Sequence, residues 1–207
     1  MKTSLGGPDS LNMDRYAETF GAFLEYSLEY DLVLNCIKET LSKIERPFSM
    51  LDIGAGTGEI IGKLGRTPGF VPTRYEAFEP NPLHLAKLLP MMESLPIDQK
   101  SISDHFFDSE THPSGQFDFI LFSHSLYWMD DPAMVFAHAF EFLEPNGCLM
   151  GILQGPYGVH TLLALFESRI QRTTPMLQNN AYSSFELMEG LRERGLRPSL
   201  NTLPTPL

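Results

Sequence analysis

The chain has 207 residues, of which 43% are hydrophobic and 20% charged, a balance typical of a soluble globular protein with a full core. Its 26 acidic residues against 15 basic ones give a formal net charge of −11. This charge argues against non-specific nucleic-acid binding and against anchoring on an anionic membrane, because both need a basic surface. A small cationic ligand is compatible with this negative net charge.

The cysteine content and the length of the hydrophobic runs further limit the class of protein. Cys36 and Cys148 are too few for a disulfide framework or a zinc cluster. No apolar run reaches the roughly 18 residues that a membrane span needs, and the N-terminal stretch MKTSLGGPDS has no apolar signal core. We therefore expect a cytoplasmic protein with reduced thiols.

The N-terminal part of the chain has a helical pattern. Between Asp14 and Ile44 the apolar residues recur at spacings of three and four, as on one face of a helix. One long helix or two helices joined by a kink both fit this pattern. Pro47 ends the stretch.

After Pro47, short apolar runs alternate with helical segments. We expect five strands at 48–53, 74–78, 101–107, 117–123 and 148–153, and helices at 58–64, 82–95, 131–143 and 183–193. Pro90 should interrupt the second of these helices, Asp131 should cap the third, and Glu144–Gly147 reads as a turn. The alternation predicts an α/β fold with a parallel sheet, whose ligand lies beyond the carboxyl ends of the strands.

The segment LDIGAGTGE at 51–59 is the most informative one. Gly54, Gly56 and Gly58 stand at alternate positions between a strand and a helix, which allows a tight turn and a close backbone approach to a ligand. The spacing is not that of a dinucleotide fingerprint, because Glu59 or Ile61 stands where its last glycine would be. No Lys-Ser/Thr pair follows, which excludes a phosphate-binding P-loop.

This segment resembles the first motif of class I S-adenosylmethionine-dependent methyltransferases. Ala77–Asn81, Phe117–Ile120 and Leu143–Gly147 resemble the end of that family's second strand, its fourth strand and the turn before its fifth. The resemblance implies a Rossmann-like parallel sheet with flanking helices and S-adenosylmethionine as cofactor. It divides the chain into an N-terminal helical lid or substrate segment at 1–46 and a cofactor-binding domain at 47–207.

The same resemblance implies roles for individual cofactor residues. Glu79 would hold the ribose diol through its two carboxylate oxygens, and Asp108 or Ser109 would accept from the adenine amine. His84 would pack on the ribose or the adenine. The remaining cofactor residues implied are Asp52, Gly54, Gly56, Gly58 and Ser123. The alternatives are a solvated turn carboxylate for Glu79 and a surface residue for His84.

The N-terminal segment resembles the histamine N-methyltransferase family, through Tyr16–Phe20 and Phe23–Glu29. This implies a small amine as acceptor, with the ring nitrogen of histamine as one example. Glu29 would receive the substrate ammonium, and a group of aromatic residues would surround the ring: Tyr16, Phe20, Tyr127 and Trp128. Carboxylates pair with ammonium groups and aromatic faces hold rings and cations. The alternatives are an exposed acid for Glu29 and core packing for the aromatics.

His124 stands where that family has an amide side chain. Methyl transfer depends mainly on positioning the nucleophile, so His124 would accept a hydrogen bond from the acceptor or act as a weak base. A histidine that faces solvent is the alternative. Val159 and Leu163 replace tryptophans of the family's substrate pocket.

The C-terminal segment departs from the family pattern. The family's sheet continues to a sixth strand and an antiparallel seventh, whereas only residues 196–207 follow Gly195 here, with prolines at 198, 204 and 206. We expect room for one short strand at most, and a fifth strand with an open edge.

Two functions stay open on this basis, and a third, a protein or nucleic-acid methyltransferase, is disfavoured by the acidic charge and by the lack of an added recognition domain. One is an active small-amine N-methyltransferase. The other is a shortened isoform that binds cofactor or a partner chain without methyl transfer. We expect a monomer, with pairing through the open sheet edge as the alternative, and no nucleic-acid or membrane partner.

Overall fold

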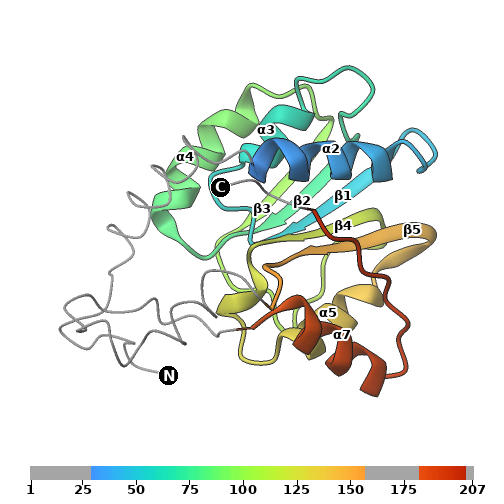
Figure 1. The fold of residues 1–207 in the computed structure, drawn as a ribbon. Helices are drawn as coiled ribbons and strands as arrows, with labels where there is room; N and C mark the ends of the chain where they lie inside the picture. The colour runs from blue at the N-terminus through green and yellow to red at the C-terminus, as the bar shows by residue number, and fades with distance from the viewer. Residues whose placement is uncertain (1–28, 157–181, 204–207) are drawn as a thin grey trace, which may run out of the picture.

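The computed structural model describes residues 29–156 and 182–203 (Figure 1). The predicted helical stretch before Glu29 lies outside the described residues, as do Tyr16, Phe20, Val159 and Leu163. The elements are α2 (Glu29–Leu41), β1 (Ser49–Ile53), α3 (Glu59–Leu64), β2 (Arg74–Phe78), α4 (Pro82–Glu93), β3 (Gln99–Ser103), β4 (Phe117–Ser123), the 3₁₀ turn η1 (Leu126–Trp128), α5 (Pro132–Phe140), β5 (Leu143–Ile152) and α7 (Ser184–Glu193).

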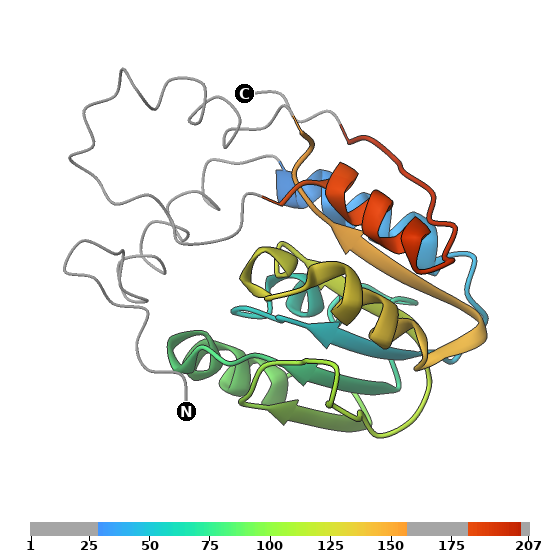
Figure 2. The ribbon, with the colours of Figure 1, turned by 90° about the horizontal axis from the view of Figure 1, so that it is seen from below.

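Five parallel strands form one sheet in the order β3-β2-β1-β4-β5. Helices α2, α3 and α4 cover one face, and α5 and α7 cover the other (Figures 1 and 2). This confirms the predicted Rossmann-like fold. The chain runs outward from β1 to β3 and then returns to β4 beside β1, so the switch point at which such sheets bind ligands lies between β1 and β4.

Alternating side chains of the central strands supply both halves of the core. Met50 points into the cluster under α2, α3 and α4, while its neighbour Leu51 joins the cluster under α5 and α7. From α2, Val33, Ile37 and Leu41 are buried in the first cluster. Helix α2 is therefore packed on the same sheet as α3 and α4.

The third strand is displaced from its predicted position. It spans 99–103 instead of 101–107, because the following residues leave the sheet as a loop over the α5 face. Phe107 of this loop packs on Phe78 with ring centroids 5.3 Å apart. Burial of Phe107 against the other face therefore takes precedence over strand pairing in this segment.

The predicted turn at Glu144–Gly147 is wrong, because these residues lie inside β5. Pairing with β4 passes from Phe117–Leu143 to Phe119–Cys148, so the extra residues form an irregularity in the ladder instead of a separate turn. Helix α5 accordingly ends at Phe140, before the predicted 143. Pro90 does not end α4, which continues to Glu93.

The outer edge of β5 is open in the part of the chain that the structure describes. There β5 pairs with β4 alone, and residues 196–203 form neither helix nor strand. No described helix has the length and apolar character to cross a membrane.

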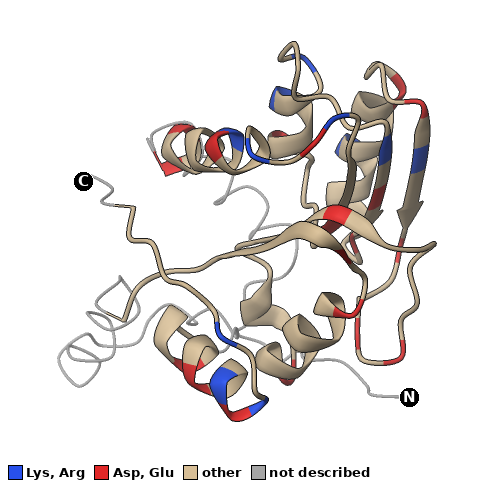
Figure 3. Ribbon diagram, turned by 90° about the vertical axis from the view of Figure 1, so that its right-hand side faces the viewer, with Lys and Arg blue, Asp and Glu red and all other residues tan. Residues whose placement is uncertain are grey.

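Acidic and basic residues are interspersed along α7 in Figure 3.

A carboxylic acid is buried at the centre of the sheet. Asp52 in β1 is 3% exposed, and the Tyr75 hydroxyl of β2 donates to its Oδ2 at 2.9 Å. Burial raises the pKa of Asp52 to about 7, although the Tyr75 hydrogen bond acts to lower it, and the charge of Glu79 raises it further. Asp52 thus keeps its proton in the folded protein well above the pH at which an unfolded aspartate loses it.

This raised pKa predicts a pH-dependent stability. Between about pH 4 and pH 7 the folded state binds more protons than the unfolded state, so the free energy of unfolding falls as pH rises, by up to about 4 kcal/mol across the window. Asp52→Asn keeps an acceptor for Tyr75 and removes this titration. Urea unfolding at about pH 5 and pH 7.5 should therefore show the variant gaining stability relative to wild type at the higher pH. The exposed Asp98→Asn is the control, and parallel curves for Asp52→Asn and wild type would contradict the prediction.

Candidate functional site

The glycine loop connects β1 to α3 at the switch point of the sheet. Gly54, Gly56 and Gly58 have φ values of 78°, 58° and 81°, a region that residues with a side chain rarely adopt. The N–H groups of Gly54 and Ala55 donate to the Phe78 carbonyl at 2.8 and 3.2 Å. The loop is therefore tied to the carboxyl end of β2.

The three glycines face different surroundings. A Cβ on Gly54 would lie 2.3 Å from Ser125 Cβ, and one on Gly58 would lie 2.2 Å from Met91 Cε. A Cβ on Gly56 would meet no atom within 4 Å. Gly54 and Gly58 thus permit close packing within the protein, while Gly56 borders open space that a bound molecule can approach.

Glu79 closes the loop from the end of β2. It is 4% exposed, its Oε2 accepts from Gly56 N–H at 2.6 Å, and its Oε1 accepts from Asn81 N–H at 2.8 Å. His84 Nδ1 lies 3.3 Å from the same Oε1. Glu79 is therefore a buried acid and no solvated turn carboxylate, and the His84 side chain, 12% exposed, packs against it.

The loop after β4 lies against the glycine loop. The Ser125 hydroxyl donates to the Ile53 carbonyl at 2.6 Å. The buried Ser123 hydroxyl has no hydrogen-bond partner within the described residues. His124 between them has a φ of 54°, which is uncommon for a residue other than glycine.

His124 joins two of the predicted substrate residues. Its Nε2 lies 3.3 Å from Glu29 Oε1 at the start of α2, and its Nδ1 lies 3.0 Å from the Tyr127 hydroxyl. The Gln154 N–H donates to the same hydroxyl at 3.1 Å. The hydrogen bond with His124 lowers the pKa of Glu29, against the opposing effect of burial. We refer to Glu29, His124 and Tyr127 as the relay trio.

Trp128 follows Tyr127 in η1 but is 41% exposed, whereas Tyr127 is 8% exposed. Trp128 is therefore part of the same turn without belonging to the core. The aromatic residues Tyr16 and Phe20, predicted for the same wall, lie outside the described residues.

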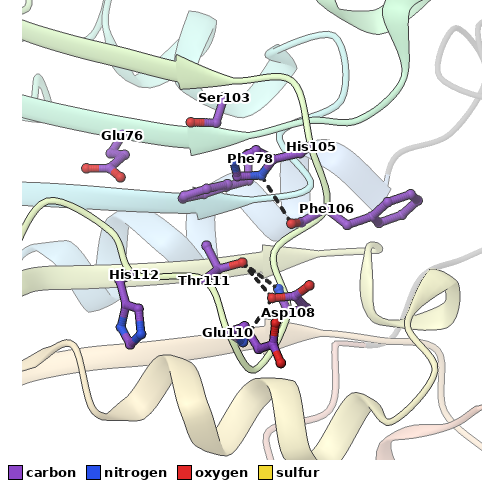
Figure 4. A pocket seen from close by; sticks show the side chains of 9 residues that line it. All are labelled: Glu76, Phe78, Ser103, His105, Phe106, Asp108, Glu110, Thr111 and His112. Atoms are coloured by element: carbon purple, nitrogen blue, oxygen red, sulfur yellow. Dashed lines mark hydrogen bonds between the residues drawn. The ribbon is translucent and has the colours of Figure 1, made fainter. Parts of the chain in front are cut away.

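A hollow of about 500 Å³ lies under the loop that follows β3 (Figure 4). Its lining comes from β2, β3 and that loop: Glu76, Phe78, Ser103, His105, Phe106, Asp108, Glu110, Thr111 and His112. Asp108 Oδ1 accepts from the Thr111 hydroxyl at 2.8 Å and from Glu110 N–H at 2.9 Å, which lowers the pKa of Asp108. Ser109 is exposed and does not line the hollow. None of the three loop glycines lines it either.

Two residues of the site were missed from the sequence. Asn81 caps α4 by accepting from Leu83 N–H at 2.9 Å, and its own N–H holds Glu79. The Asn-Pro pair at 81–82 is a helix-start signal that was available. The Gln154 contact with Tyr127 had no sequence signal, because it depends on where β5 ends in space.

Comparison with known proteins bears on this site. A family model described as a methyltransferase domain matches residues 26–198. No curated protein matches.

Several solved structures share the fold. A complex between the Haloferax volcanii Trm112 methyltransferase activator and a putative methyltransferase has a TM-score of 0.60 at 18% identity, covering 89% of this chain and 74% of that one. A possible histamine N-methyltransferase from Thermotoga maritima has a TM-score of 0.55 at 16% identity, covering 87% and 78%. The N-methyltransferase NodS from Bradyrhizobium japonicum, in complex with S-adenosyl-L-homocysteine, has a TM-score of 0.57 at 16% identity, covering 80% and 72%.

The family model spans most of the chain, and the described structure has the parallel sheet, the glycine loop at its switch point and the acid after β2. On these findings the chain belongs to the methyltransferase domain family and is an S-adenosylmethionine-dependent methyltransferase.

Proposed function

We propose that this enzyme transfers a methyl group to a nitrogen of a small amine. The observation that carries the proposal is the contact of Glu29 with His124 at the carboxyl edge of the sheet. It puts an ionised carboxylate beside the loop after β4, which itself packs on the glycine loop. A negative group at this position attracts a cationic acceptor.

The cofactor fits the glycine loop and Glu79. S-adenosylmethionine supplies a methyl group on a positively charged sulfur. The open space at Gly56 lets the backbone approach it closely. A carboxylate has about four acceptor sites, and the N–H groups of Gly56 and Asn81 use two of those on Glu79. We propose that the remaining capacity receives the ribose hydroxyls, with His84 beside them.

The other predicted cofactor residues have separate proposed roles. Asp108 lines the hollow together with the rings of His105 and Phe106, and its ionised carboxylate is the acceptor that we propose for the adenine amine. Ser123 offers its hydroxyl beside the glycine loop. Asp52 is buried against Tyr75, and we propose that it supports the loop from below without touching the cofactor.

The acceptor would lie beside the relay trio, with Trp128 and the predicted aromatic residues Tyr16 and Phe20 around its ring. Histamine is one amine of this kind. The chemistry requires little beyond holding the nucleophile in line with the methyl group.

A second function is favoured by the open edge of β5 in the described residues. A chain that pairs through this edge, binds cofactor and transfers no methyl group is the alternative to an active monomer. The free thiols of Cys36 and Cys148 are compatible with a cytoplasmic location for either form.

Calorimetry followed by a radiolabelled transfer assay distinguishes the two functions. We expect S-adenosylmethionine to bind and its methyl group to appear on members of a panel of small amines. Binding without transfer to any amine would overturn the first function and support the second. Absence of cofactor binding would contradict both.

A pair of glycine variants tests where the cofactor lies. Gly56→Ala adds a methyl group to open space, so it should cost only about 1 kcal/mol of stability for its positive φ and still weaken cofactor binding at least about tenfold. Gly54→Ala should lower the free energy of unfolding several-fold more than Gly56→Ala does, since its Cβ would overlap Ser125. Thermal unfolding and calorimetry measure the two effects. Wild-type cofactor affinity in a folded Gly56→Ala protein would show that the site is misplaced.

A further inference from the structure

We propose that the relay trio of Glu29, His124 and Tyr127 conducts a proton, and that the attacking nitrogen of the acceptor therefore arrives protonated, as an alkylammonium. This inference rests on the proposed function and narrows its substrate class. It separates alkylamines from acceptors such as the imidazole ring, whose attacking nitrogen already carries a free lone pair near neutral pH.

The contacts of His124 define where its proton sits. Glu29 is ionised and only accepts, so His124 Nε2, 3.3 Å away, carries a hydrogen toward it. Nδ1 of a neutral Nε2–H imidazole can only accept, so in the 3.0 Å contact the Tyr127 hydroxyl donates to it, while the Tyr127 oxygen accepts from Gln154 N–H. In its neutral form His124 is thus an Nε2–H imidazole whose Nδ1 is the accepting atom.

This arrangement takes up a proton without any heavy atom moving. When an N–H proton of the acceptor passes to the Tyr127 oxygen, the original Tyr127 proton passes to His124 Nδ1. Tyr127 is unchanged by the exchange, and the imidazolium that forms is paired with the Glu29 carboxylate through Nε2–H. The proton balance of the step is complete, because the methyl carbon leaves sulfur for nitrogen while the displaced N–H proton ends on His124 and later returns to water.

The surroundings of His124 contain no competing cation among the described residues. The titratable groups that face it are Glu29 and Tyr30 from α2, with the Tyr30 ring 6.4 Å away, and Tyr127 from η1. Gln154, after β5, is uncharged. The left-handed backbone of His124 costs on the order of 1 kcal/mol, and the contacts of its ring nitrogens with Glu29 and Tyr127 hold it in place.

The location of the trio suits proton transfer next to the methyl donor. His124 precedes Ser125, whose Cβ is the atom that prevents a side chain on Gly54. Of the trio, the Glu29 side chain is 27% exposed and the His124 side chain 18% exposed. The unit is therefore shielded yet adjacent to the glycine loop.

The need for such a unit depends on the acceptor. An alkylammonium, with an ordinary pKa near ~10, has no lone pair at neutral pH and must lose a proton before it attacks. A general base adds about 10²- to 10⁴-fold to such a step. An imidazole acceptor attacks through its unprotonated nitrogen and gains nothing from it.

His124→Asn is the variant of choice, because asparagine tolerates the left-handed backbone. We expect kcat/KM for an alkylamine to fall at least about 100-fold at neutral pH, with the deficit shrinking about tenfold per pH unit toward the amine's own pKa. Transfer to an imidazole acceptor should fall much less and without this pH dependence, because its attacking nitrogen needs no deprotonation. Tyr127→Phe should behave like His124→Asn, and Tyr182→Phe, on the α7 side of the protein, is the matched control.

An equal loss with both acceptors, or a loss that does not vary with pH, would overturn the relay while leaving the proposed function intact. If the wild type transferred the methyl group to imidazole acceptors but to no alkylamine, the relay would also be overturned and the proposed function would stand. Absence of transfer to any amine would overturn the proposed function and this inference with it.

A second measurement needs neither cofactor nor activity. In ¹⁵N spectra of histidine-labelled protein, the resonances lost in His124→Asn identify this residue. We expect the neutral ring to carry its proton on Nε2, and Tyr127→Phe to shift the Nδ1 resonance, since that variant removes its hydrogen-bond donor. A neutral ring protonated on Nδ1 would contradict the relay.

Discussion

The hydrogen bond from Gly56 N–H to the buried carboxylate of Glu79 is the constraint on which the site depends. It spans 2.6 Å and joins the loop after β1 to the end of β2. A carboxylate that is 4% exposed is costly to bury without donors, and its acceptance from Gly56 N–H adds to the Phe78 carbonyl as a tie on the glycine loop. Each therefore holds the other, and Gly56 is left bordering the open space in which we propose that the cofactor binds.

Local signals in the sequence predicted the strands and the glycine loop around this hydrogen bond. The strands at 74–78 and 117–123 are short apolar runs bounded by polar or turn residues, and both are found at the predicted positions. Alternate glycines between a strand and a helix indicated the loop, and its φ values agree. The family resemblance pointed to Glu79, whereas only the structure shows that the carboxylate is held by Gly56.

The other half depends on contacts that no local pattern encodes. Glu29 and His124 are distant in sequence and meet because α2 packs on the sheet beside the end of β4. The Pro-Asn-Gly run at 145–147 is a turn signal by itself, yet register with β4 places it within β5. The path of the chain after β3 was set by burial of Phe107, and this path brings Asp108 to the wall of the hollow.

These contacts give some of the excess acidic residues a specific structural role. Asp52 and Glu79 are buried and stabilised by donors from Tyr75 and Gly56, so they shape the site without adding charge to the surface. Glu29 is different, because it lies 3.3 Å from His124, the residue that we propose takes up the proton. The amide that the resembled family has in place of His124 can accept a hydrogen bond but cannot take up a proton. A histidine there pairs the carboxylate with a base, and this pairing favours an acceptor that must give up a proton before it is methylated.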